Sequence, residues 1–224
     1  MKHVTGPLLR IVLLAVILTS WWLTLKTQFP VVINLSIIAG DVLLTYPLVW
    51  LGRKILDRDK TPEHAVKVTT FVHSGLGFTF GIPIVLALST HDKWSYLVLP
   101  VPPAIGLILV FITGTATFLT VLNLALKGFG APFFIRLSRK LAADWMYAWT
   151  RNPMVLAALT FLVSLGIWFQ SVLFVVWALI IFSPALLFFV RVFEEKELEY
   201  RFGSSYLEYK SRTPLLFPRK PGTV

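Results

Sequence analysis

Long runs of apolar residues divide this chain, and they limit its possible folds more than any other feature. Six runs stand out in the 224-residue sequence, at 8–25, 31–51, 68–88, 97–126, 154–169 and 172–193. Four or five of them reach the roughly 20 residues that a helix needs to cross a bilayer. Only 14% of the residues are charged and the mean hydropathy is +0.76. We therefore expect an integral membrane protein, an all-α polytopic bundle of about five to six transmembrane helices.

Two details of the runs predict how the last helices are arranged. Only Gln170 and Ser171 separate the fifth run from the sixth, and the fifth is short, which predicts that the last two helices form a tight hairpin. Pro100, Pro102 and Pro103 lie near the start of the fourth run. Because proline removes a helical hydrogen bond, we expect a kink or a loop before that helix becomes continuous.

The charged residues indicate the topology. Lys and Arg total 21 against 11 Asp and Glu, and the basic residues gather in segments 52–67 and 127–153 and in the C-terminal tail. The alternate connections hold only Lys26 and Lys93. Six crossings with both termini on the cytoplasmic side satisfy the positive-inside rule. The excess of basic residues is therefore explained by membrane topology, and we expect no nucleic acid as a partner.

The absence of cysteine narrows the chemistry. Without cysteine the chain has no disulfide, no thiolate nucleophile and no cysteine-ligated metal, and we predict no metal site. No internal repeat or soluble second domain is visible. We predict one integral membrane domain over residues 1–224, with transmembrane helices in 1–126 and the catalytic chemistry in 127–224.

Polar residues and residues of special geometry gather in two segments that flank the predicted hairpin. The first leads from Tyr147 into an Arg-Asn-Pro turn at residues 151–153. The second has a glutamate pair at residues 194–195, followed by Phe-Gly-x-x-Tyr-x-x-Tyr over residues 202–209. Over about Gly128 to Pro218 the chain resembles the isoprenylcysteine carboxyl methyltransferase family and its phospholipid methyltransferase relatives. Trp145 and Met146 stand where that family usually has Gly-Pro.

The resemblance implies a methyltransferase that uses S-adenosylmethionine, bound in a cytoplasmic cofactor cleft. The cofactor-binding residues that it implies are Arg139, Lys140, Leu141, Ala142, Tyr147, Asn152, Pro153, Met154, Val155 and Glu194. The catalytic candidates are Arg151, Arg191 and Glu195. Because Asn152 precedes proline, we expect an extended backbone there and an amide that is free to bind a ligand.

Elementary chemistry supports these roles. A carboxylate near a low-dielectric boundary attracts a cationic cofactor more strongly than one in water, which suits Glu194 and Glu195. Arg151 and Arg191 can neutralise an acceptor carboxylate or a lipid phosphate. The acceptor is expected to be an apolar or lipidated small molecule or protein that arrives from the bilayer among membrane lipids. An isoprenylcysteine-like carboxylate is the first hypothesis and a lipid amine is the alternative.

Other interpretations of the same residues remain open. Residues 194–199 also suit the solvated face of a juxtamembrane helix, with Arg191–Glu195 and Glu197–Arg201 as i,i+4 pairs. We interpret Tyr206 and Tyr209 as interfacial aromatics.

Two further hypotheses concern the whole protein. One is a transporter or scaffold that is not an enzyme, in which the intramembrane Asp41 would matter. The structural interpretation of Asp41 is a helix contact or a pairing with His73 or Arg10. The other is the wider fold shared with membrane sterol reductases, which use a nicotinamide cofactor. The oligomeric state is left open.

Overall fold

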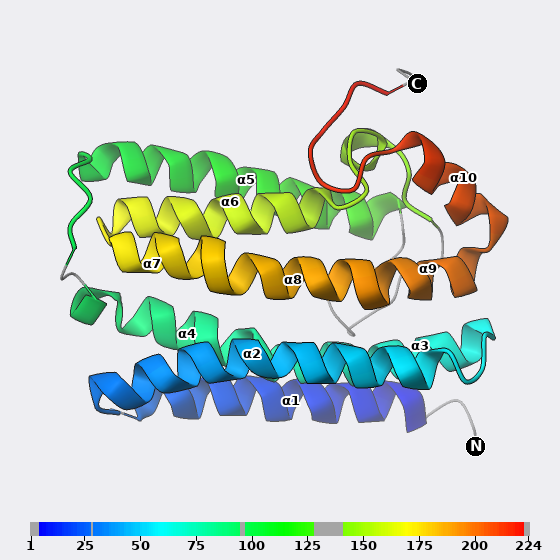
Figure 1. Ribbon diagram of the computed structural model, residues 1–224, viewed down its shortest axis with the longest axis horizontal. Coiled ribbons are helices and arrows are strands. Elements are labelled where there is room, and N and C mark those ends of the chain that lie inside the picture. Colours follow the sequence, from blue (N-terminus) through cyan, green and yellow to red (C-terminus); the bar gives the residue numbers. More distant parts are fainter. Residues whose placement is uncertain (1–4, 28, 95–96, 128–140, 222–224) are drawn as a thin grey trace.

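The computed structural model describes residues 5–27, 29–94, 97–127 and 141–221. This part of the chain is all-helical and contains no strand. The helices run side by side along one long axis (Figure 1). In lipid a backbone must satisfy its own hydrogen bonds, and helices do so within each segment.

Five helices in the described part are long and apolar enough to cross a membrane. Four are α1 (Thr5–Lys26), α2 (Val31–Leu56), α3 with α4 (Pro62–Thr79 and Gly81–Ser89) and α5 (Pro103–Lys127). The fifth runs over Val172–Phe202 and joins α7 (Val172–Val176), η3 (Trp177–Phe182), α8 (Ser183–Phe189), η4 (Val190–Glu194) and α9 (Glu195–Phe202). A shorter apolar helix, α6 (Pro153–Trp168), lies beside α5. The predicted all-α polytopic bundle is confirmed, and the chain is an integral membrane protein.

The predicted hairpin and proline break are both present. Residues 169–171 alone connect α6 to α7, and Gln170 makes that turn with a φ of 55°. Segment 97–101 runs beside the turn, where Leu99 N donates to Gln170 O (2.9 Å) and Gln170 Nε2 donates to Val101 O (2.9 Å). Helix α5 therefore begins at Pro103, because the preceding residues are held in an extended segment.

Small residues let α5 and α6 approach closely, as they do in many membrane helix pairs. A Cβ added to Gly106 of α5 would lie 2.4 Å from the Trp168 Cα atom, at the end of α6. Farther along, Thr113 Oγ1 donates to Ser164 Oγ at 3.3 Å. The short α6 is thus held along α5 by backbone proximity and a polar contact.

The core lies between α2, α3, α4, α6 and the composite helix 172–202, whose buried apolar side chains form one cluster. Helices α1 and α5 lie outside it and expose many large apolar side chains, among them Ile11 and Phe111, as expected of surfaces that face lipid. The start of α1, the α2–α3 connection, the start of α6 and α10 (Ser204–Arg212) all lie at one end of the bundle (Figure 1). We call this the basic end, because it carries residues such as Arg53, Lys54 and Arg58.

The α5–α6 contact makes a testable prediction. Gly106→Ala should lower the free energy of unfolding by about 1–3 kcal/mol, because its methyl group would overlap the Trp168 backbone. Gly40→Ala in α2 is the matched control, since no atom lies within 4 Å of a Cβ added there. Thermal unfolding of both variants in the same detergent micelles tests this, and equal effects would contradict the close approach.

Candidate active site

A cavity of about 120 Å³ opens at the basic end of the bundle. Its walls come from α3, α5, the segment before and into α6, the η4–α9 junction and α10. These elements are distant in the sequence, so the cavity exists only in the folded bundle.

Most of the predicted site residues line this cavity. They are Leu141, Ala142, Tyr147, Arg151, Asn152, Met154, Val155, Glu194 and Glu195. Pro153 is buried as the first residue of α6, whereas Arg191 is exposed on η4 and lies outside the cavity. Arg139 and Lys140 fall outside the described residues. The two sequence segments that flank the hairpin therefore meet, as the motif interpretation expects.

The cavity also includes residues that sequence reasoning did not assign to it. They are Thr69, His73, Leu124, Phe193, Glu197, Leu198, Arg201, Tyr206 and Tyr209. Tyr206 and Tyr209 are 1% and 6% exposed, so their interpretation as interfacial aromatics is wrong. Their three-residue spacing on an amphipathic helix was the available signal for a buried face. Asp41, by contrast, lies in α2 outside the cavity.

The turn before α6 binds the C-terminal tail. Asn152 Nδ2 donates to Leu215 O at 2.9 Å, Thr150 Oγ1 donates to the same oxygen at 3.2 Å, and Arg151 N donates to Pro214 O at 2.9 Å. Pro153 occupies the first helical position, where its missing N–H costs nothing. The expectation of a free Asn152 amide is therefore corrected, because its nitrogen holds the tail.

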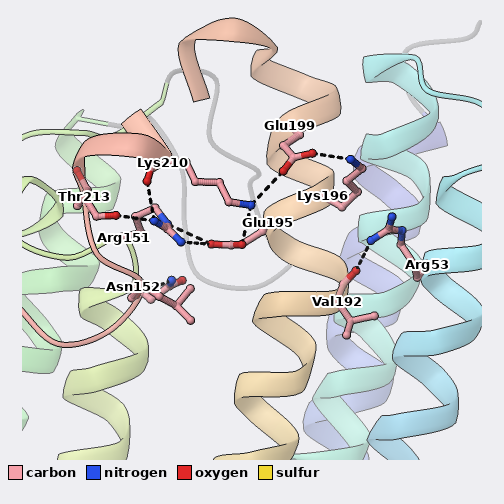
Figure 2. A network of polar contacts seen from close by, with 10 residues as sticks. Arg53, Arg151, Asn152, Val192, Glu195, Lys196, Glu199, Lys210 and Thr213 are labelled. Carbon is pink, nitrogen blue, oxygen red and sulfur yellow. Dashed lines mark hydrogen bonds and ion pairs between the residues drawn. The ribbon is translucent and has the colours of Figure 1, made fainter. Parts of the chain in front are cut away.

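Arg151 is the centre of a polar network (Figure 2). Its Nε and Nη2 donate to Glu195 Oε1 at 3.1 and 2.5 Å, and its Nη1 donates to the carbonyl oxygens of Lys210 (2.9 Å) and Thr213. Its side chain is only 11% exposed. These bonds use most of the donors of a guanidinium, so Arg151 joins α6 to α9, α10 and the tail.

The network continues along α9. Lys210 Nζ lies 2.8 Å from Glu195 Oε2 and 3.1 Å from Glu199 Oε1, and Glu199 also accepts from Lys196 at 2.6 Å. Burial lowers the pKa of Lys210, but its hydrogen bonds to the two glutamates outweigh this and raise the pKa above its ordinary value. The expected Arg191–Glu195 pair is wrong, because Glu195 pairs with Arg151 and Lys210 instead. The expected Glu197–Arg201 pair is present at 2.8 Å.

Glu194 differs from its neighbours. It ends η4, lines the cavity, and has no hydrogen-bond or ion-pair partner among the residues that the structure describes. Burial and the nearby Glu194 carboxylate raise the pKa of Tyr147, so this phenol stays protonated. Tyr209 Oη donates to Tyr147 O at 2.7 Å and holds the η2 turn (Trp145–Ala148) over the cavity.

Within the described part of the chain, three carboxylates and two guanidiniums line the cavity. The carboxylates belong to Glu194, Glu195 and Glu197, and the guanidiniums to Arg151 and Arg201. Glu195 pairs with Arg151 and Glu197 with Arg201, so Glu194 is the lining carboxyl group that a cationic ligand can approach.

Trp145, just before Tyr147, has a φ of 52°, in the left-handed region that favours glycine. The resembling family usually has glycine at this position. Here a tryptophan that is 59% exposed adopts this left-handed conformation.

The buried Arg151–Glu195 pair should stabilise the fold more than the exposed Glu208–Arg212 pair does. Glu195→Ala should lower the free energy of unfolding by about 3 kcal/mol, because it leaves the buried Arg151 without its carboxylate. The matched control is Glu208→Ala on α10, whose pair with Arg212 is exposed and should contribute less than about 1 kcal/mol. Chemical unfolding in detergent micelles measures both, and comparable losses would show that the Arg151 network does not stabilise the fold.

Comparison with known proteins found a family match. A sequence model described as phospholipid methyltransferase matches residues 101–205. No curated protein and no solved structure matches the chain. The matched region runs from the segment before α5 into α10, and it contains the Arg-Asn-Pro turn and the glutamate pair. The resemblance in the sequence is thereby confirmed: residues 101–205 match the phospholipid methyltransferase family, a family of integral membrane methyltransferases.

Proposed function

We propose that this protein is an S-adenosylmethionine-dependent methyltransferase whose acceptor comes from the bilayer. One observation carries the proposal: Tyr147, Asn152 and Glu194, from separate segments, line one cavity at the basic end of the bundle. The match to a methyltransferase family over residues 101–205 supports methyl transfer. We further propose that the basic end is cytoplasmic, because basic residues gather there while the opposite end carries Lys26 and Lys93.

The cavity fits the charge of this cofactor. The Glu194 carboxylate has no partner among the described residues and is suited to an ammonium, a sulfonium or ribose hydroxyls. The protonated Tyr147 phenol is suited to donate a hydrogen bond to a carboxylate or a hydroxyl. When bound, S-adenosylmethionine supplies an electrophilic methyl carbon on a sulfonium.

The protein contributes orientation and shielding from water. The buried Tyr206 and Tyr209 cover the cavity from α10, and the Arg151 network fixes α10 and the tail over it. Holding donor and acceptor in line accounts for a large part of the barrier reduction in such displacements, and a water-poor site strengthens it.

The acceptor end of the cavity is formed by membrane-spanning helices. Thr69 and His73 lie one turn apart on α3, and Leu124 and Phe193 complete this wall. An apolar acceptor that enters from lipid would meet these side chains, while a polar cofactor would enter from the basic end.

A lipid amine is the acceptor that we favour over the isoprenylcysteine-like carboxylate. Arg191 lies outside the cavity and the donors of Arg151 are largely engaged, so the two cations expected to hold a carboxylate are not presented to it. A lipid amine needs no cation to hold it, and in water it is present as an ammonium. Such an acceptor must lose a proton before its nitrogen attacks the methyl carbon, and a ring nitrogen of His73 is suited to accept that proton.

The hypothesis of a transporter or scaffold rests on Asp41. Asp41 lies outside the cavity, so the cavity gives that hypothesis no support. The reductase-like alternative requires a nicotinamide cofactor, and direct titration distinguishes it.

Calorimetric titration of the detergent-purified protein with S-adenosylhomocysteine tests the cofactor. We expect a Kd on the order of micromolar, weakened at least about tenfold by Glu194→Gln, because the variant removes a charged acceptor from the cavity. Glu208→Gln, on the exposed face of α10, serves as control and should bind like the parent protein. Binding of the nicotinamide dinucleotide phosphate instead, or no binding by a folded parent, would refute the methyltransferase proposal.

Transfer of a labelled methyl group tests the acceptor. With vesicles of an ethanolamine phospholipid we expect label on the headgroup nitrogen, and His73→Gln should lower kcat by about 100-fold without changing S-adenosylhomocysteine affinity. His64→Gln is the control, since this histidine lies at the start of α3 and contacts Ile55 O at 2.8 Å. Label on a farnesylcysteine carboxylate, and none on the amine, would favour the alternative acceptor.

A further inference from the structure

Arg53 lies outside the region that matches the family and contacts the turn that precedes the glutamate pair. It lies in the last turn of α2, and its Nη1 donates to Val192 O at 2.9 Å while its Nε donates to Asp57 Oδ2 at 2.7 Å. Figure 2 shows the Val192 contact beside the Arg151 network. This bond links the end of α2 to a backbone carbonyl two residues before Glu194.

The carbonyl belongs to an unusual turn. η4 is a π-helical segment, in which Glu195 N donates to Val190 O, five residues back. Such turns are rare and recur at functional sites. One extra residue in a turn rotates everything that follows by about 100° relative to a regular α-helix. The directions of Glu194 and Glu195 therefore depend on whether this turn keeps its π form.

Helix α2 contacts the same turn a second time. A Cβ added to Gly52 would lie 2.3 Å from Val72 Cγ2 and 3.4 Å from Phe193 Cε2, so α2 packs closely on α3 and on η4. Phe193 is fully buried and lines the cavity. Consecutive residues of α2 thus hold consecutive residues of η4, directly before Glu194.

Arg53 also has a partner at the protein surface, Asp57. Asp57 also accepts a hydrogen bond from Tyr200 Oη at 2.7 Å. Burial is the largest single effect on the pKa of Asp57 and raises it, but the bonds from Tyr200 and Arg53 together with the charges of Arg53 and Lys196 lower the pKa below its ordinary value. The Asp57 side chain is 39% exposed, so this pair contributes little by itself. The Val192 bond is the contact that links Arg53 to the cavity.

We propose that Arg53 is a positioning residue for the cofactor site. By binding the Val192 carbonyl it keeps η4 in its π form, which directs the Glu194 carboxylate into the cavity and Glu195 toward Arg151. The inference rests on the proposed cofactor role of Glu194. It assigns to α2, outside the matched region, control over the cofactor carboxylate.

S-adenosylhomocysteine affinity of the full-length protein in detergent micelles tests the proposal. Arg53→Met, which keeps an apolar stem, should weaken binding about tenfold, as expected for loss of one charge-assisted bond. Two controls separate the contacts: Asp57→Ala removes the surface partner, and Lys54→Ala removes a neighbouring cation that contacts Trp50. Both should bind within about twofold of the parent protein. A second substitution, Arg53→Lys in the Asp57→Ala background, should restore affinity to within about threefold because the Val192 carbonyl remains its acceptor.

A double-mutant cycle separates positioning from a general loss of stability. In the Glu194→Gln background, Arg53→Met should weaken binding less than about threefold further, because the carboxylate that it positions is already absent. Additive losses, or parent-like binding by a folded Arg53→Met protein, would overturn the proposal. Should Arg53→Met fail to fold, Arg53→Gln takes its place under the same criteria. If the parent protein does not bind S-adenosylhomocysteine, the proposed function fails, which is distinct from these outcomes.

Discussion

The buried ion pair between Arg151 and Glu195 is the interaction on which the site depends. A guanidinium removed from water is stable only when its donors are matched, and here the carboxylate of Glu195 in α9 and the carbonyls of Lys210 in α10 and Thr213 in the tail match them. Because these partners come from three segments that lie far from Arg151 in the sequence, one side chain connects the start of α6, the end of the last transmembrane helix, α10 and the tail. The geometry around Asn152 and Tyr147 follows from that attachment.

The lipid environment explains why the site is built on a distorted helix. An unbroken hydrogen-bonded backbone has to continue through the membrane, so the glutamates cannot be displayed on an exposed loop there. A π turn changes the direction of side chains while the backbone stays bonded, and η4 lies where the apolar helix meets the polar cavity. The contacts from α2 stabilise this distortion from outside the motif.

The apolar runs predicted the bundle, the hairpin at Gln170 and the break before Pro103, because membrane spans are governed by local composition. The motif identified Tyr147, Asn152 and Glu194 as residues of one cavity, since their spacing carries the family signature. The partner of Glu195 could not be predicted, because an i,i+4 pairing with Arg191 assumes 3.6 residues per turn and η4 departs from that period. The contributions of Thr69 and His73 depend on how α3 packs against α9, which no local pattern records.

The cavity wall is formed by two parts of the chain, one inside the region that matches the family and one before it. The side chains assigned to the cofactor lie within the matched region, whereas Thr69 and His73 lie in a helix that precedes it. Under the proposed function, substitutions in that helix would change which acceptor fits the cavity and leave the residues proposed to bind the methyl donor in place.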